Sequence, residues 1–377
     1  MNRPRFLVFS LAASVIAFVG GAAGRPRAAN TTLMLLVVLA CFGCREADAQ
    51  VAALAHLRVP AVPAVRKPPP APAPSPLDDE ARAKGFNECN PPDRLGLGPY
   101  GPFHQLVMGK MLIPQKGGHT ADMGYDVIVH LHGADAVRKL LVPTARGVSL
   151  VLIDKGTGGA GPYMKTLGSK LVFPQLRKSI ERALQKQSGD ERAHIRHLAL
   201  TAWSAGGVAV SKLLEQQQEG IDAVVILDGL HGAWKQGARR EQQTSSLDAR
   251  FIKREIALAD RARRGDGLFV LTHSAVDPFT FPATGTTARQ LLEELGLRAK
   301  TVEPGSDPFG PTSTLDERGL HVWGFLGKDK LGHCAQLFHM PRIVTEILEP
   351  AWGTPAMDRS VKPTPHPDWA FTRAKHH

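Results

Sequence analysis

Short apolar runs alternate with helical patterns along the chain from position 101 onward. The runs are mostly six to nine residues long, rich in Val, Ile and Leu, and apolar on both faces, as buried parallel strands are. Between two of them, Phe173, Leu176 and Ile180 share one side of a predicted helix. This alternation predicts an α/β fold, a three-layer sandwich with a mostly parallel sheet. The predicted strands are 106–114, 125–131, 148–154, 197–202, 222–228, 268–273 and 319–325, and the predicted helices are 171–187, 205–218, 284–295 and 341–348.

The first 80 residues have a different character. Two apolar stretches, 6–21 and 33–43, each follow a pair of arginines, which is typical of an export signal, and neither reaches the length of about 20 residues that a membrane span needs. The second stretch contains Val-Leu-Ala-Cys, similar to a bacterial lipobox, so we expect lipidation at Cys41, with Cys44 as the alternative. A Pro/Ala-rich segment follows and suits an extended tether. The expected parts are an export signal over 1–44, a tether over 45–80 and one folded domain over 81–377.

Composition excludes two classes of protein. With 43% hydrophobic and 21% charged residues, the chain is not a disordered protein. The net charge of +11 includes four arginines of the leader, and aromatic residues make up only 6% of the chain. No basic stripe is interleaved with stacking residues, so we expect no nucleic-acid partner.

The most informative motif is Thr-Ala-Trp-Ser-Ala-Gly-Gly over 201–207, between a predicted strand and a predicted helix. It resembles the nucleophile elbow of the α/β-hydrolase superfamily, G-x-S-x-G, with Ala202 in place of the first glycine. The resemblance implies that Ser204 is the nucleophile and that the Ala205 amide binds an oxyanion. Taken alone, the motif equally suits a small-residue helix start with a serine near its cap.

Further motifs of the same superfamily follow in the same order. His-Gly after the strand 125–131 resembles the oxyanion loop, which implies that Gly133 or Ala134 supplies a second oxyanion donor. Gly-His at 332–333 resembles the turn after the last strand, which implies that His333 is the general base. His339 is the rival histidine but lies closer to the terminal helix.

Two aspartates are candidates for the acid that orients His333. Asp277 lies in Ser-Ala-Val-Asp-Pro, which resembles the superfamily's usual turn after the penultimate strand, with Ser274 in place of glycine. Asp228 closes the strand 222–228, a position from which some members supply the acid. We favour Asp277 and keep Asp228 as the alternative.

Two patterns suggest other ligands. Residues 156–161 match G-x-G-x-x-G, but Pro162 follows and no acid lies at the tip of a strand about 20 residues on, which favours an active-site loop over a dinucleotide site. His130 and His132 share a strand face, yet no third ligand with recognisable spacing accompanies them. We therefore expect no cofactor and no metal.

Cysteines and one long connection complete the predictions. Cys89 and Cys334 are the only cysteines beyond the leader, and in an oxidising compartment they can form one disulfide or remain two buried thiols. The connection 231–267 suits either a cap over the site or an outer helix over 247–264.

Together these features predict an exported, membrane-tethered lipoprotein facing the periplasm or cell surface. Its domain is expected to be a serine hydrolase that cleaves an ester of a small-molecule or acylated substrate through an acyl-enzyme. The alternatives are a peptidase or thioesterase of the same fold and a catalytically inert binding lipoprotein.

Overall fold

The computed structural model describes residues 89–156, 159–238, 242–278, 281–303 and 310–364. All of them belong to the second of two units into which the chain divides, Pro68–His377. The export signal, both candidate lipidation sites and the tether lie outside the described residues.

A ten-stranded sheet forms the centre of the domain, in the order β1-β2-β4-β3-β5-β6-β7-β10-β9-β8. Its six central strands run parallel, and antiparallel strands flank them on both sides. The parallel strands are β4 (Ser149–Ile153), β3 (Gly124–Leu131), β5 (His194–Trp203), β6 (Ala223–Leu227), β7 (Leu268–His273) and β10 (Leu320–Gly324). The flanking strands are β1 (His104–Gln105), β2 (Lys110–Leu112), β9 (Ser313–Glu317) and β8 (Lys300–Thr301).

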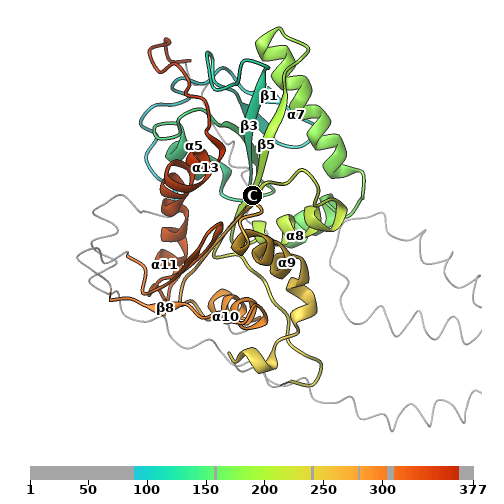
Figure 1. The fold of residues 1–377 in the computed structure, drawn as a ribbon, viewed down its shortest axis with the longest axis vertical. Helices are drawn as coiled ribbons and strands as arrows, with labels where there is room; N and C mark the ends of the chain where they lie inside the picture. The colour runs from blue at the N-terminus through green and yellow to red at the C-terminus, as the bar shows by residue number, and fades with distance from the viewer. Residues whose placement is uncertain (1–88, 157–158, 239–241, 279–280, 304–309, 365–377) are drawn as a thin grey trace, which may run out of the picture. The chain divides into compact units, whose positions relative to one another are not determined.

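Helices cover both faces of this sheet (Figure 1). The face of α7 (Val172–Ser188), α8 (Gly206–Gln216), α9 (Lys253–Arg263) and α10 (Thr284–Glu294) encloses one hydrophobic core. The face of α5 (Ala134–Leu141) and the C-terminal helical region, 340–352, encloses the second core. The predicted three-layer α/β fold is confirmed.

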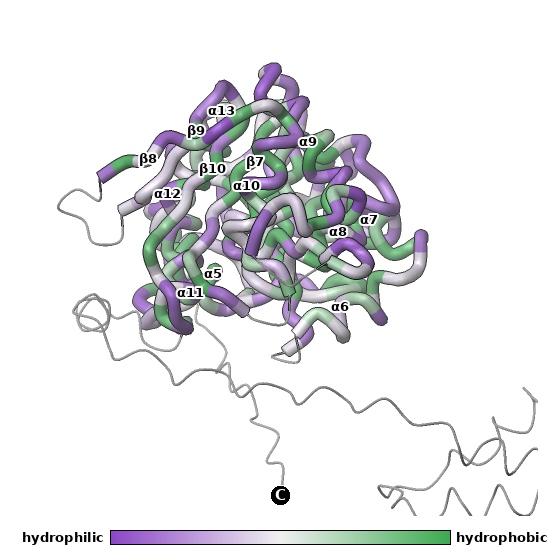
Figure 2. Tube along the Cα trace, turned by 90° about the horizontal axis from the view of Figure 1, so that it is seen from below, coloured by the Kyte–Doolittle hydropathy of each residue, from purple (hydrophilic) through white to green (hydrophobic). Residues whose placement is uncertain are grey.

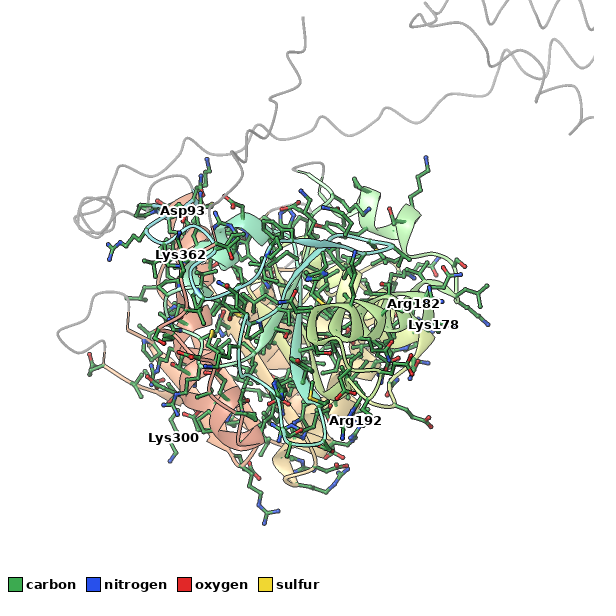
Figure 3. The ribbon with its side chains drawn as sticks, turned by 90° about the horizontal axis from the view of Figure 1, so that it is seen from above. Asp93, Lys178, Arg182, Arg192, Lys300 and Lys362 are labelled. Carbon is green, nitrogen blue, oxygen red and sulfur yellow. A yellow bond between two sulfur atoms is a disulfide. The ribbon has the colours of Figure 1, made fainter. Side chains whose placement is uncertain are left out.

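Side chains divide between these cores and the surface as the sequence pattern requires. Phe173, Leu176 and Ile180 of α7 are fully buried, whereas Lys178 and Arg182 of the same helix project outward (Figure 3). Hydropathy follows the same division over the domain, with the hydrophobic segments gathered inside (Figure 2). Within the described ranges, no helix is both long and apolar enough to cross a lipid bilayer.

One strand differs from the sequence-based prediction, and one connection follows the second of its two predicted alternatives. The run 106–114 is not one strand, because a turn closed by the Leu106 amide and the Gly109 carbonyl separates β1 from β2. Gly109 has a φ of 78°, and a Cβ there would overlap the Leu152 carbonyl oxygen, so this turn requires glycine. Part of the connection 231–267 is α9, which packs against β7 and α8 as a member of the helical layer.

Candidate active site

The predicted nucleophile elbow lies where β5 ends and α8 begins. Ser204 has a φ of 52°, a left-handed conformation that is uncommon for residues other than glycine, and the Ser204 amide donates to the Leu227 carbonyl at 2.9 Å. Positions 206 and 207 require glycine. A Cβ on Gly206 would overlap the Leu131 carbonyl, and a Cβ on Gly207 would overlap the Gly229 carbonyl. The two glycines therefore leave room for the backbone that follows β3 and β6, and this close packing holds Ser204 in its strained conformation.

The same strain recurs on the neighbouring strands. His132, Ser204 and Asp228 all have positive φ, and they follow β3, β5 and β6, which are adjacent and parallel. Parallel strands end at one edge of a sheet, so three strained polar residues gather there. This edge is where the sequence predicted the site.

The carboxylate that contacts His333 belongs to Asp228. His333 Nδ1 lies 2.6 Å from Asp228 Oδ2, and because a carboxylate only accepts, Nδ1 carries the proton of the neutral ring and Nε2 the lone pair. Ser274 donates to the same carboxylate through its amide at 2.9 Å and its hydroxyl at 2.5 Å. Burial alone would raise the pKa of Asp228, but these hydrogen bonds and the nearby His333 outweigh it and lower the pKa.

The predicted contact between Asp277 and His333 is wrong. Asp277 is exposed and accepts a hydrogen bond from Gln242 Nε2 at 2.8 Å. The physical reason is the position of each backbone. Asp228 directly follows β6, and its amide donates to the Thr272 carbonyl of β7. Asp277 lies three residues beyond Ser274 in the loop after β7. Ser274, which replaces the usual glycine, instead supports the Asp228 carboxylate.

The backbone amides of the predicted oxyanion loop donate to a carboxylate of the protein. The amides of Gly133 and Ala134 donate to Asp154 Oδ2, at 3.1 and 3.3 Å. A carboxylate thus occupies both amides predicted to bind an oxyanion, and in this conformation they are not available for that role. Ala205 immediately precedes α8, where the first amides of the helix have no intrahelical acceptor. The role of the Ala205 amide as an oxyanion donor stays a prediction.

Two further histidines adjoin the elbow, and the sequence analysis assigned neither to the site. His132 stacks on Trp203 with ring centroids 5.3 Å apart, and burial lowers its pKa. His231 donates from Nε2 to the Ser204 carbonyl at 3.0 Å, and burial lowers its pKa as well. The sequence feature that could have indicated His231 is its position three residues after Asp228. Burial therefore favours the neutral form of both rings.

The remaining predicted features take the following places. His130 is buried, with Nδ1 2.8 Å from the Thr201 hydroxyl and Nε2 2.7 Å from the His132 carbonyl, so its ring is a structural group. His339 stacks on Phe325 with ring centroids 4.2 Å apart. In the described part of the chain, no three His, Cys, Asp or Glu residues are placed to hold a metal ion. The short helix α6 (Gly161–Thr166) begins at the last glycine of the G-x-G-x-x-G pattern.

A disulfide joins Cys89 to Cys334, with Cα atoms 4.7 Å apart. This separation lies within the range that disulfide geometry allows. Cys334 follows His333 in α11 (Lys330–Ala335), so the bond ties this short helix to the beginning of the described chain.

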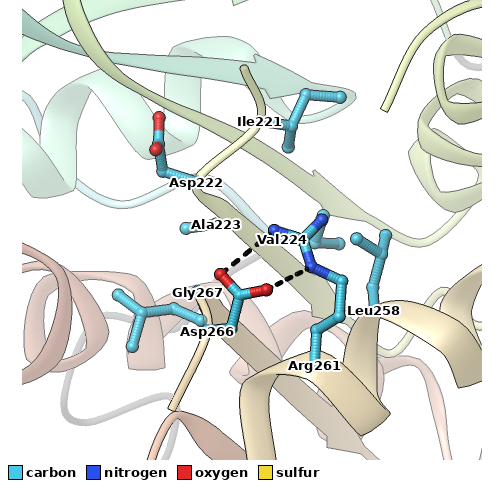
Figure 4. A pocket seen from close by; sticks show the side chains of 9 residues that line it. Ile221, Asp222, Ala223, Val224, Leu258, Arg261, Asp266 and Gly267 are labelled. Atoms are coloured by element: carbon cyan, nitrogen blue, oxygen red, sulfur yellow. Dashed lines mark hydrogen bonds and ion pairs between the residues drawn. The ribbon is translucent and has the colours of Figure 1, made fainter. Parts of the chain in front are cut away.

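One pocket lies at the other edge of the sheet, near the beginning of β6 and β7, and is lined by Ile221, Asp222 and Leu258 among others (Figure 4). Arg261 and Asp266 close it with an ion pair of 3.0 Å. Its volume of about 10 Å³ is that of a single water molecule. The pocket is therefore no substrate site.

Several solved structures resemble the chain at low identity. An enterobactin esterase from Shigella flexneri is 12% identical with a TM-score of 0.37, over 70% of this chain and 63% of that one. An acylaminoacyl peptidase from Pyrococcus horikoshii is 14% identical with a TM-score of 0.37, over 68% and 41%. A poly(3-hydroxybutyrate) depolymerase from Bordetella parapertussis is 15% identical with a TM-score of 0.37, over 63% and 85%.

The chain spans less than two thirds of the length of the first two of these proteins. No protein-family model matches the sequence, and no curated protein matches it at a significant level. Because the likenesses are distant, we infer the chemistry from the geometry of the site alone. The mostly parallel sheet, with helices on both of its faces, gives the protein a three-layer α/β fold.

Proposed function

We propose that the protein is a serine hydrolase that cleaves carboxylic esters through an acyl-enzyme. The observation that carries the proposal is the pair of His333 Nδ1 and Asp228 Oδ2, 2.6 Å apart. Ser204 has the left-handed backbone of a tight turn and directly follows Trp203, whose ring contacts His333. A nucleophile, an acid and a base that follow β5, β6 and β10, in this order, match the roles of a catalytic triad.

The first half of the reaction forms the acyl-enzyme. His333 Nε2 accepts the Ser204 hydroxyl proton as the oxygen attacks the ester carbonyl carbon. Asp228 holds the ring in this tautomer and stabilises the imidazolium that forms. The Ala205 amide at the start of α8 donates to the oxyanion. The proton then passes from Nε2 to the leaving alcohol, and the carbon–oxygen bond breaks.

The second half returns the enzyme to its starting state. Water takes the place of the alcohol, gives a proton to Nε2 and attacks the acyl carbon. The tetrahedral intermediate collapses, the proton returns to Ser204, and the carboxylic acid leaves. An ester is the first choice of substrate, and a peptide or thioester is the alternative because the same residues cleave those bonds.

A fluorophosphonate probe tests the proposal, since it labels only an activated serine. We expect labelling of the full chain and none of Ser204→Ala, together with hydrolysis of p-nitrophenyl esters. Ser274→Ala is an informative companion, because it removes a serine of the same site that contacts Asp228 and should retain labelling. An unlabelled wild-type protein that folds normally would mean an inert binding protein.

We also propose export and lipidation at Cys41, on the basis of the leader sequence. Mass spectrometry of the protein from its native host should find a lipid-modified N-terminal cysteine. An intact Met1 would refute this part of the proposal without affecting the chemistry.

A further inference from the structure

Trp203 makes two separate contacts with His333. Its Nε1–H donates to the backbone carbonyl of His333 at 3.0 Å. Its ring also lies against the imidazole, with centroids 4.8 Å apart and planes tilted by 30°. Trp203 is the last residue of β5 and directly precedes Ser204, so one side chain connects the nucleophile's strand to the histidine.

The helix that carries His333 needs such support. α11 has six residues, and a helix of this length does not hold its own conformation in water. Asp329 caps its first turn by accepting from the Gly332 amide at 2.9 Å, and the disulfide at Cys334 fixes its other end. The hydrogen bond from Trp203 lies between these two attachments and fixes the backbone of His333 itself.

The indole face also suits a cation. An imidazolium within about 6 Å of an indole centroid is attracted by the negative face of the ring. His132 contacts the same indole, but burial lowers its pKa and leaves it neutral. The other titratable groups around His333 are Asp228, which favours the imidazolium, and His231, whose pKa burial also lowers. In the proposed reaction His333 Nε2 takes the serine proton, so His333 is the ring beside Trp203 on which positive charge develops.

We propose that Trp203 is a positioning residue for His333, orienting it through the backbone hydrogen bond and favouring its protonated form through ring stacking. The inference rests on the proposed hydrolase function for its kinetic consequence. The expected effect of Trp203 on the His333 ring does not depend on that function, because it can be measured in the protein without turnover.

Two variants separate the two contacts. Trp203→Phe keeps an aromatic face and loses the N–H donor, whereas Trp203→Leu loses both. Trp323→Leu is the matched control, because Trp323 is similarly buried and its Nε1 donates to Asp316 at 2.9 Å. Its ring contacts His321 and Arg342, which lie outside the proposed triad.

The first measurement is the pH dependence of kcat/KM for a p-nitrophenyl ester. In Trp203→Leu we expect the acid limb to move down by roughly 0.5 to 1 pH unit, since loss of a cation–π contact disfavours the imidazolium. We expect kcat to fall at least about tenfold with KM within about twofold, as a transition-state effect requires. Trp203→Phe should keep the acid limb of wild type and lose about fivefold in kcat, the cost of one neutral hydrogen bond.

The second measurement is the imidazole titration of His333 by NMR, which needs no catalysis. A lower pKa of His333 in Trp203→Leu, with little change in Trp203→Phe and Trp323→Leu, supports the proposal even if no ester is cleaved. An unchanged titration in Trp203→Leu overturns it, as does a rise in KM that matches the fall in kcat. If Trp203→Leu does not fold, an unchanged kcat in Trp203→Phe overturns the positioning role.

Discussion

Replacement of Asp228 by asparagine is expected to abolish turnover while preserving the fold. In wild type, one carboxylate oxygen accepts from His333 Nδ1 at 2.6 Å and the other from the Ser274 amide at 2.9 Å. An asparagine can accept from the Ser274 amide, but its NH2 group then faces His333. The ring must offer Nδ1 as an acceptor, so Nε2 carries the proton and cannot act as a base.

The magnitude follows from this change of tautomer. A wrong tautomer in a catalytic triad costs about 10⁴-fold in turnover, which is about 5 kcal/mol of transition-state stabilisation. The folded state loses less, roughly 1–3 kcal/mol, for a buried polar group with a poor partner. Since the pKa of Asp228 is lowered in the folded state, its stabilising effect is present above the unfolded pKa of about 3.9 and disappears as the pH falls through the folded value.

The assay compares Asp228→Asn with Asp277→Asn in p-nitrophenyl ester hydrolysis between pH 6 and 9. Asp277 is exposed, so its amide variant should keep turnover within about threefold of wild type. Urea unfolding of both variants shows whether the fold is retained. Substantial turnover in Asp228→Asn, together with its loss in Asp277→Asn, would refute the assignment.

Three further outcomes test the architecture around the site. Reduction of the Cys89–Cys334 disulfide, which closes a separation of 245 residues, should lower the unfolding free energy by about 2–4 kcal/mol in denaturant titrations, and an unchanged midpoint would contradict this. Gly207→Ala should prevent correct folding because its Cβ would overlap the Gly229 carbonyl, whereas Gly161→Ala, with open space around it, should show a wild-type melting temperature. Asp126→Asn should lose about 3 kcal/mol of stability without a change in KM, because Asp126 is fully buried against an arginine; equal stability would argue against that pair.

The fold was predictable because its signal is repeated along the chain. Buried parallel strands require apolar residues on both faces, and six of the seven predicted runs overlap the central strands of the sheet. The seventh run, 106–114, begins with the turn at Gly109 and contains only the short strand β2, and the apolar composition of the run does not indicate that turn. Helices α6 and α11 were not predicted because six residues are too few for a periodic pattern.

The site was predictable only as far as local conformation determines it. The positions of Ser204 and His333 follow from turn motifs whose glycines are required by close backbone contacts, of Gly206 with Leu131 and of Gly332 with Gly327. The choice between Asp228 and Asp277 depends on where α11 places His333, and no local pattern contains that information. Likewise, the partner of the Gly133 amide is Asp154, 21 residues away and directly after β4, and only the assembled sheet brings them together.

The location of backbone strain makes this sheet edge suited to the proposed catalysis. His132, Ser204 and Asp228 each have a positive φ, an arrangement that costs free energy at each residue and persists only where the surroundings enforce it. Here the surroundings are hydrogen bonds from the elements next to each residue: the His132 amide to the Ile153 carbonyl, the Ser204 amide to the Leu227 carbonyl and the Asp228 amide to the Thr272 carbonyl. Each bond joins a residue beyond one strand to the neighbouring strand, so the sheet itself fixes the three backbones. A site held in this way needs little reorganisation when charge develops, which is the condition for electrostatic stabilisation of a transition state.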